Sequence, residues 1–315
     1  MRSHPRRLLH YGGIPMSLAT IVSGITSYGF GDTTAICLLG WSIWWIASIL
    51  AVASSVLLIC LIVSREISSA ENVTGAWLLL VAPLAVCAAA GGSIAELLPN
   101  DSQALLTLLT SYFLLGAGAP LTGCIVILYI YRITVHKLPP HDAIITAFIP
   151  LGPIGQIGVA ALSLGGSANA ILPGTVPLID GLGTTMLNLG IILALLAWGF
   201  SVYWIIHAIF SVIYQRRSAA IPFNISWWAL TFPLGVFAIL TCLLAETMDL
   251  WYFRVQFIAL VAILLALWLF NIARTVAGAW TGAIFGIQSI APNCNIPEST
   301  ISSNNSTVYC SDTHV

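Results

Sequence analysis

The most constraining feature of this sequence is a series of eight long apolar stretches, of the kind that cross a bilayer as helices of roughly 20 residues. Hydrophobic residues make up 59% of the chain and charged residues only 7%, against about a quarter in soluble domains. Polar or Gly- and Pro-containing breaks separate the stretches, which lie at about 11–29, 34–63, 76–97, 104–131, 143–165, 181–214, 226–247 and 251–273. The pattern predicts an all-α membrane protein with eight transmembrane helices.

We expect one transmembrane transport domain over residues 1–286, followed by a disordered cytoplasmic tail over 287–315, where Ser, Thr and Asn dominate. No A-x-A-like site follows the first apolar stretch, so a cleaved signal peptide is not expected. The ten Lys and Arg nearly balance the eleven Asp and Glu, so bulk charge does not indicate nucleic acid as a partner. The partner that composition does indicate is a lipid bilayer.

The charged residues separate by side of the membrane. Nine of the ten basic residues fall at the amino terminus, in alternate connections, or after the last stretch: Arg2, Arg6, Arg7, Arg65, Arg132, Lys137, Arg216, Arg217 and Arg274. The opposite connections carry acidic residues, with Arg254 as the one basic exception: Asp32, Glu96, Asp101, Asp180, Glu246 and Asp249. Because basic loops stay in the cytoplasm, this bias predicts that both termini are cytoplasmic.

Four of the odd-numbered stretches open with a proline followed by small and apolar residues. The prolines are 68, 70 and 80 residues apart, at Pro15, Pro83, Pro153 and Pro233. A proline in the first turn of a helix sacrifices no hydrogen bond, because that N–H has no partner within the helix. Each repeat is therefore predicted to be a Pro-started helix, a short outer turn and a second helix that returns.

The two helices of each predicted hairpin differ in composition. Odd stretches are rich in small residues, as at 88–93 and 155–161, whereas even stretches are rich in Leu, Ile and Trp, as at 38–45. Lipid contact favours large apolar side chains, and close packing or a narrow pathway favours small ones. We therefore expect an inner ring of odd helices inside an outer ring of even helices. The alternative is that the small residues only let backbones approach, without a pore.

Candidate pore-lining residues lie on the odd stretches, at Thr20, Ser93, Gly155, Gln156, Gly235 and Thr241. No carboxylate falls near the middle of a stretch, which favours a passive or weakly coupled pathway over a pump built on a buried acid. Helix amino ends are partly positive, so four Pro-started ends on the cytoplasmic side would attract anions, unless they are ordinary helix starts. The one histidine inside a stretch, His207, is interpreted as an interfacial or packing residue.

Enzymes and receptor-like membrane proteins are the competing classes. The sequence has no H-E-x-x-H, no G-x-S-x-G and no paired carboxylates on one stretch, so an enzyme is not expected. None of the seven cysteines forms a C-x-x-C pair, so no metal or cofactor site is expected. A receptor would not explain the small-residue repeat, and ion flux without substrate turnover in liposomes would favour transport.

Motifs at the predicted helix starts resemble those of a known family. They are His4-Pro5 with IPMSLAT at 14–20, LGPIGQ at 151–156, WWALTFPLG at 227–235 and the closing ARTVAG at 273–278. In order and spacing they are similar to the tellurite-resistance/dicarboxylate transporter family, which includes fungal sulfite efflux pumps, malate permeases and plant slow anion channels. The LGPxGQ string resembles the fungal members most.

The resemblance implies ten helices in five hairpins around a central pore, commonly in a homotrimer. It also implies a pore-blocking aromatic on the ninth helix, which corresponds to Phe232 here, although a packing phenylalanine is the alternative. The first hairpin is expected before His4-Pro5 and is missing from this sequence. We therefore expect four hairpins around a pseudo-fivefold pore that lacks one hairpin, with a non-transporting truncated membrane protein as the alternative.

The resemblance further implies a small inorganic or organic anion as the substrate. Sulfite or bisulfite efflux across the plasma membrane is the first expectation, because the LGPxGQ string and the His-Pro start suit that branch. C4-dicarboxylate (malate) transport is the second, since a doubly charged acid should need a cationic contact and no Lys or Arg lies in the middle of a stretch.

Overall fold

A computed structural model describes residues 9–28, 34–64, 73–139, 143–176, 179–217, 221–280 and 282. The chain divides into two units, Met1–Arg274 and Thr275–Val315, and the fold below is that of the first unit. Of the second unit, residues 275–280 are helical. The predicted boundary at residue 286, the tail at 287–315 and the His4-Pro5 motif lie outside the described residues, so these stay predictions.

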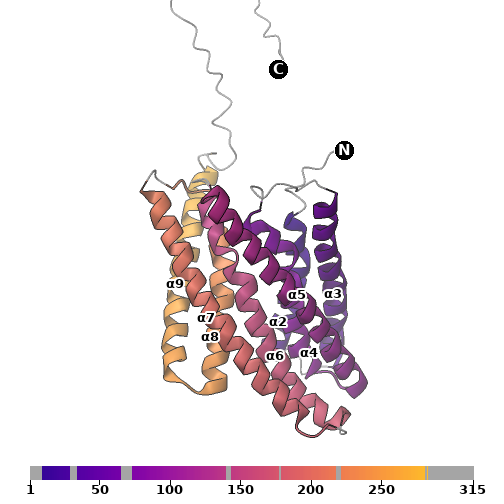
Figure 1. Ribbon diagram of the computed structural model, residues 1–315. Coiled ribbons are helices and arrows are strands. Elements are labelled where there is room, and N and C mark those ends of the chain that lie inside the picture. Colours follow the sequence, from indigo (N-terminus) through magenta and orange to yellow (C-terminus); the bar gives the residue numbers. More distant parts are fainter. Residues whose placement is uncertain are drawn as a thin grey trace, which may run out of the picture. The chain divides into compact units, whose positions relative to one another are not determined.

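The regular elements of the described residues are all helices (Figure 1). The α-helices are α2 (Gly13–Ser27), α3 (Thr34–Val63), α4 (Ala82–Ala95), α5 (Asp101–His136), α6 (Leu151–Thr175), α7 (Leu182–Arg216), α8 (Thr231–Met248) and α9 (Trp251–Trp280). Four short 3-10 helices precede the even-numbered α-helices, and they are η1 (Leu9–Gly12), η4 (Gly75–Leu80), η5 (Ile144–Phe148) and η6 (Ile225–Leu230). The all-α prediction is confirmed.

Seven helical segments of the described chain are long and apolar enough to cross a membrane. The first predicted stretch, at 11–29, corresponds to the shorter apolar helix α2 of 15 residues, with η1 directly before it. Part of that stretch is in 3-10 and loop geometry, which explains why a hydropathy count made it longer than the helix. The multi-pass character of the chain is confirmed.

Burial separates the helices into an inner and an outer set, as the composition predicted. The most apolar windows of the segments containing α4, α6 and α8 are 89%, 89% and 56% buried. Those of α3, α5, α7 and α9 are 39%, 33%, 22% and 6% buried. Large side chains of the outer helices are therefore exposed where lipid would surround the molecule, whereas the small residues of α4 and α6 allow neighbours to cover them on all sides.

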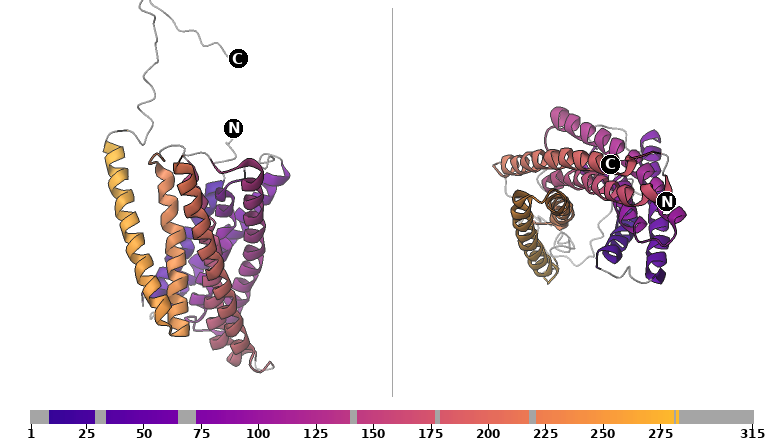
Figure 2. Two further views of the ribbon diagram at one scale, coloured as in Figure 1. Left: turned by 60° about the vertical axis from the view of Figure 1, so that its left-hand side comes forward. Right: turned by 90° about the horizontal axis from the view of Figure 1, so that it is seen from below.

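The inner helices stand in a row, in the order α2, α4, α6 and α8, and each packs against the next. The two ends of the row, α2 and α8, do not pack together to the same degree. Seen from below in Figure 2, the brown α8 and α9 stand apart from the indigo α2 and α3. The four hairpins thus form an open arc rather than a closed ring.

Glycines let the helices of this arc approach closely. A Cβ at Gly190 of α7 would lie 2.4 Å from the carbonyl oxygen of Ala161 on α6. A Cβ at Gly92 of α4 would lie 2.5 Å from the Ser163 hydroxyl on α6. Real side chains do not reach such distances, so these two glycines are required for the present spacing of α6 against its neighbours on both sides.

Candidate functional site: the row of inner helices

The inner helices all begin at one end of the molecule, which we call the proline end, and finish at the opposite, carboxylate end. Pro15, Pro83, Pro153 and Pro233 lie in the first turns of α2, α4, α6 and α8. The first four N–H groups of a helix have no intrahelical acceptor, so the prolines cost no hydrogen bond there. The repeat noticed in the sequence is thus a repeat of helix starts.

The short helices η1, η4, η5 and η6 form a layer at the proline end, with each packed against the next along the row. Three of them receive a side-chain donor from an outer helix. Ser54 of α3 donates to Leu80 O at 2.9 Å, and Trp204 of α7 donates to Ala147 O at 2.9 Å. Asn271 of α9, which is fully buried, donates to the main chain of η6 at 3.2 Å. Outer helices therefore hold the starts of inner helices in position.

Phe232 occupies the position directly before the repeated proline. The equivalent positions in the other three repeats carry Ile14, Ala82 and Gly152. Phe232 is 37% exposed, and its ring lies against Gly152, where a Cβ would be 3.2 Å from the nearest ring carbon. The largest side chain of the four thus lies over the smallest, on the neighbouring inner helix. This geometry permits the predicted gate and also permits simple packing.

Equivalent positions of consecutive repeats meet further along the row. Ser93 and Ser163 lie ten residues after Pro83 and Pro153, and their hydroxyl oxygens are 3.3 Å apart. Three residues further on, Glu96, directly after α4, lies opposite Gly166 of α6, where a Cβ would be 3.8 Å from the Glu96 carboxylate. The repeat therefore brings matching levels of neighbouring inner helices into contact.

A seam of hydroxyl groups joins α4 and α6 at this level. Ser163 donates to Ala89 O at 3.0 Å and Ser167 donates to Gly92 O at 2.9 Å. The fully buried Ser167 hydroxyl also lies 2.8 Å from the Glu96 carboxylate, which is an alternative acceptor for its one proton. The sequence interpretation found Ser93 but missed its partner Ser163 and the neighbouring pair of Ser167 and Glu96. Their spacing of about 70 residues, the same as that of the two prolines, is the signal that could have found them.

Three of the six candidate pore-lining positions face neighbouring helices. At Gly155 a Cβ would be 3.2 Å from Val236, so this glycine lies at the contact of α6 with α8. Gly235 faces α9, where the nearest side-chain atom lies 3.7 Å from a Cβ position. The fully buried Thr241 hydroxyl accepts from Trp198 of α7 at 3.2 Å. These residues hold the row together, and their role in a pathway stays a prediction.

The other three candidates differ in exposure. Thr20 of α2 is exposed, and its hydroxyl donates to Met16 O at 2.9 Å within the same helix. Ser93 is half-buried in the α4–α6 seam, and Gln156 of α6 is 8% exposed. Together with Phe232, they place hydroxyls, an amide and an aromatic ring on the inner helices, and their role in an anion pathway stays a prediction.

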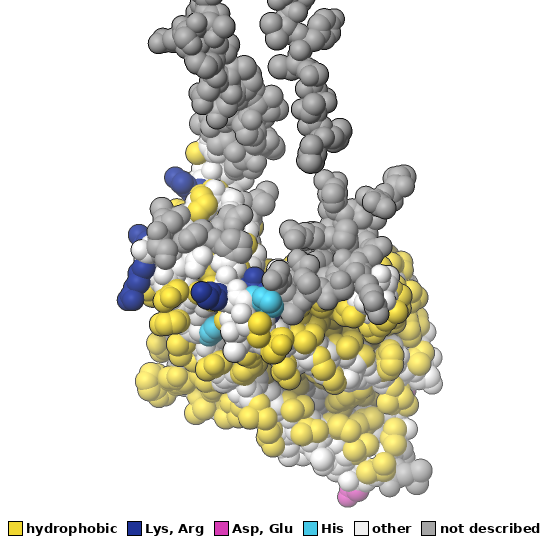
Figure 3. All heavy atoms as spheres, turned by 45° about the horizontal axis from the view of Figure 1, so that its top comes forward, with side chains coloured by type: hydrophobic (Ala, Val, Ile, Leu, Met, Phe, Trp, Pro, Cys, Tyr) yellow, Lys and Arg dark blue, Asp and Glu magenta, His cyan; other side chains and the backbone are white. Residues whose placement is uncertain are grey.

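Charged side chains divide between the two ends. The described basic residues of the first unit, apart from Arg254, lie at or near the proline end, and they are Arg132, Lys137, Arg216, Arg217 and Arg274. The described acidic residues all lie toward the carboxylate end, and they are Glu96, Asp101, Asp180, Glu246 and Asp249. Arg254 pairs with Asp249 there. Figure 3 shows Lys, Arg and His gathered at the upper end, and Asp or Glu at the opposite tip.

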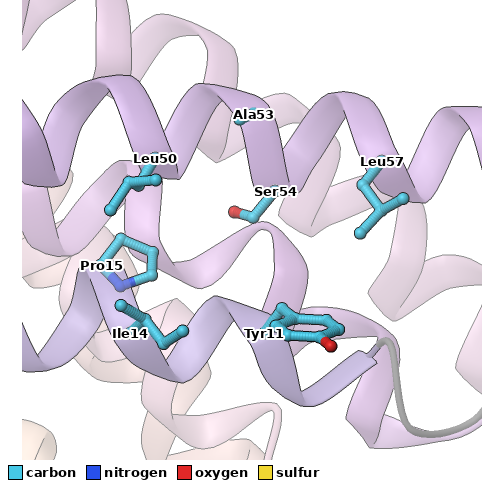
Figure 4. Close-up of a pocket in the computed structure, with 7 residues that line it drawn as sticks. All are labelled: Tyr11, Ile14, Pro15, Leu50, Ala53, Ser54 and Leu57. Atoms are coloured by element: carbon cyan, nitrogen blue, oxygen red, sulfur yellow. The ribbon is translucent and has the colours of Figure 1, made fainter.

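A pocket of about 200 Å³ lies between α2 and α3 near the proline end (Figure 4). Tyr11, Pro15 and Leu57 are among its lining residues, and Ser54 brings the one aliphatic hydroxyl. Because Ser54 already donates to Leu80 O, little polar capacity remains for a charged ligand. The lining of the pocket fits an apolar group better than an anion. Within the described residues, no group of three His, Cys, Asp or Glu is placed to hold a metal ion.

Comparisons with known proteins agree with this architecture. Residues 1–276 match the family described as the SLAC1 voltage-dependent anion channels. The chain is 33% identical over 288 residues to the sulfite efflux pump SSU1 of Arthroderma otae, which covers 90% of this chain and 75% of the relative. It is 32% identical over the same shares to the sulfite efflux pump SSU1 of Trichophyton rubrum.

A more distant relative is an uncharacterized transporter of Methanocaldococcus jannaschii, 28% identical over 180 residues, which covers 57% of this chain and 49% of the relative. No solved structure matches the chain significantly. These relatives are transporters and channels rather than enzymes, in agreement with the sequence prediction. The tellurite-resistance/dicarboxylate transporter resemblance is confirmed at the level of the family, and the chain belongs to the SLAC1-type voltage-dependent anion channel family.

Proposed function

We propose that this chain exports sulfite or bisulfite across the plasma membrane. The observation that carries the proposal is the similarity to sulfite efflux pumps, at 33% identity over 90% of this chain. The row of Pro-started inner helices lies within the matched region and has the small-residue composition expected of a pathway. The proposed location is the plasma membrane, because a protein that removes sulfite from the cell must lie there.

The charge distribution supports a cytoplasmic position for the proline end and for both termini. Basic residues lie at this end and acidic residues at the other, which is the bias that the positive-inside rule describes. The partly positive starts of four inner helices and the surrounding Arg and Lys side chains would concentrate small anions at the cytoplasmic mouth. Anions would then pass Phe232, the proposed gate, and leave beside Glu96 and Glu246.

The inner helices favour a small anion over a C4-dicarboxylate. No Lys or Arg occurs in α2, α4, α6 or α8, whose residues are all described. A dicarboxylate with two full charges would lose most of its hydration in such a pathway without a cation to replace it. Bisulfite carries one charge and three oxygens, which serine hydroxyls, the Gln156 amide and backbone N–H groups can contact.

Expression in a sulfite-sensitive cell that lacks its own exporter tests the proposal. We expect the chain to raise the sulfite concentration that the cells tolerate and to leave malate uptake at the background rate. Malate uptake without sulfite rescue would identify the dicarboxylate as the substrate instead. Neither activity, with the chain present in the plasma membrane, would favour a non-transporting membrane protein.

We also propose that the chain assembles as a homotrimer, as the family resemblance implies. The broad exposed apolar surface of the outer helices offers area for such contacts, because the most apolar window of α9 is only 6% buried. The mass of the purified complex, measured after subtraction of bound detergent, should be three times 33.6 kDa. A mass that corresponds to one chain would contradict the trimer without affecting the transport proposal.

A further inference from the structure

We propose that the proline ends of α5 and α7 form a binding site for the phosphate group of an anionic membrane lipid, with Arg132 at its centre. The site lies on the outer helices, outside the row of inner helices, and the inference does not depend on which anion is transported. It starts from a charged side chain that the fold buries and that no acidic residue of the described chain neutralises.

Arg132 lies one turn before the end of α5 and is only 8% exposed. Its Nη1 donates to Lys137 O at 3.1 Å, and its Nε has no hydrogen-bond partner. Within the described chain, the acidic residues lie toward the opposite end of the molecule, so none of them neutralises this guanidinium. A buried cation left unpaired is costly, which points to an anion that is bound here in the membrane.

Two further buried polar atoms without a partner lie around Trp204 of α7. The Tyr129 side chain is fully buried and its hydroxyl has no partner, and the buried Nε2 of His207 has none either. Both rings contact Trp204, with centroids 6.0 Å and 5.3 Å away. Tyr129 and Arg132 are one helical turn apart on α5, so this aromatic cluster lies one turn from the guanidinium. The Tyr129 hydroxyl and His207 Nε2 are closed off from the surface, so the phosphate contact falls to the Nη groups of Arg132, which is 8% exposed.

The ends of the two helices are tied together around this region. Gln215 of α7 donates to Pro139 O, just beyond α5, at 3.2 Å. Exposed basic side chains then border it, from Lys137 at the end of α5 and from Arg216 and Arg217 at the end of α7. Basic pockets between transmembrane helices on the cytoplasmic side are the places where anionic headgroups bind.

The surface below the basic residues identifies the ligand as a lipid rather than a soluble phosphate. Ile127 and Tyr131 of α5 are 67% and 56% exposed, and Ile206 and Phe210 of α7 are 62% and 65% exposed. Acyl chains would cover these side chains while the headgroup reaches Arg132. In Figure 3 the blue and cyan side chains lie directly above a broad yellow surface, which is the polarity of a lipid molecule.

The test compares spin-labelled phosphatidic acid with spin-labelled phosphatidylcholine in proteoliposomes that contain the full chain, with the motionally restricted fraction of each lipid measured by electron paramagnetic resonance. We expect the unmodified chain to select phosphatidic acid. Arg132→Gln, which keeps a donor for Lys137 O and removes the charge, should lower that selectivity about fivefold. Lys137→Gln changes an exposed side chain and should lower the selectivity for phosphatidic acid by a smaller factor. This second variant tests the site independently of whether the Arg132 variant folds.

Arg254→Gln is the matched control, because it removes the same charge at the opposite end, and it should leave the selectivity unchanged. An equal loss in this control would mean that net charge alone attracts the lipid, and the site would be refuted. Unchanged selectivity in a folded Arg132→Gln variant would refute it as well. Displacement of the lipid by millimolar glycerol phosphate at the same efficiency as by phosphatidic acid would identify a site for soluble phosphate instead.

Discussion

The proline end and the carboxylate end of the inner row are built in different ways. At the proline end, each inner helix follows a 3-10 segment, and outer helices donate side-chain hydrogen bonds into three of those segments. At the carboxylate end, serine hydroxyls join α4 with α6, and Thr184 of α7 donates to the Asn169 side chain of α6 at 3.1 Å. Glu96 and Glu246 stand exposed there. The first end is basic and its 3-10 segments are held by outer helices, whereas the second is acidic and is joined by hydroxyl groups.

This difference teaches how a repeat of nearly apolar helices can carry an anion. In the proposed pathway, partly positive helix starts would define where the ion enters, because their dipoles need no mobile charged side chain in the bilayer. The opposite end carries charge of the wrong sign for an anion and would therefore limit its return. The experiments below test each end in turn.

Trp204→Ala should have the largest effect, because Trp204 is 1% exposed and its indole N–H holds Ala147 O at the proline end. Removal of a buried tryptophan costs about 3–5 kcal/mol in soluble proteins, and the lost hydrogen bond adds to this. We expect a large drop in the denaturant midpoint of the purified chain. Trp268→Ala on α9, at a side chain that is 46% exposed, is the control and should change little. An equal drop in the denaturant midpoint of both variants would show that the Trp204 contact does not stabilise the proline end more than an exposed tryptophan stabilises α9.

Phe232→Ala should raise anion conductance several-fold if the ring occludes the pathway where it lies over Gly152. Single-channel or macroscopic current in planar bilayers measures the effect, with the amount of reconstituted protein as the normalisation. Phe113→Ala on α5, whose ring is 62% exposed, is the control for loss of an aromatic side chain and should leave the current unchanged. An unchanged or smaller current in the Phe232 variant would assign the ring to packing.

The helical architecture could be predicted from the sequence, but the directions of individual side chains could not. Helix starts at Pro15 and Pro233 and the burial of the small-residue helices follow from local chemistry and composition, so they could be predicted. The direction of Thr241 could not, because it depends on Trp198, a residue 43 positions away that reaches its hydroxyl. Phe232 likewise required knowledge that α6 brings Gly152 beneath the ring.

Glu96→Gln and Glu246→Gln should ease anion entry from the carboxylate end. Both residues lie 13 positions after a repeated proline, Glu96 directly after α4 and Glu246 on α8, and both are exposed. Neutralising them lowers local repulsion, so we expect a rise of about twofold to fivefold in anion current from that side at low salt, and less at 0.15 M salt. Gln keeps an acceptor for Ser167, so the α4–α6 seam should survive.

Asp101→Asn is the control for these two variants, since Asp101 carries the same charge at the same end but begins the outer helix α5. Its effect on the current should be smaller than that of either glutamate. A rise of equal size would mean that the general surface potential, rather than the ends of the inner helices, controls entry. A current that does not depend on salt would contradict the electrostatic explanation altogether.

Ser93→Ala should have the smallest effect on stability. It tests how much the hydroxyl contacts between α4 and α6 stabilise the carboxylate end. The change removes one hydroxyl contact, with Ser163 at 3.3 Å, while Ser163 keeps its bond to Ala89 O. Hydrogen bonds between membrane helices contribute about 0.6 kcal/mol on average. We therefore expect the free energy of unfolding to fall by about that amount, against no measurable change for Ser17→Ala, whose exposed hydroxyl bonds only within α2. A loss several times larger would mean that the carboxylate end is held as firmly as the proline end, because a single hydroxyl contact there would then stabilise much of the row.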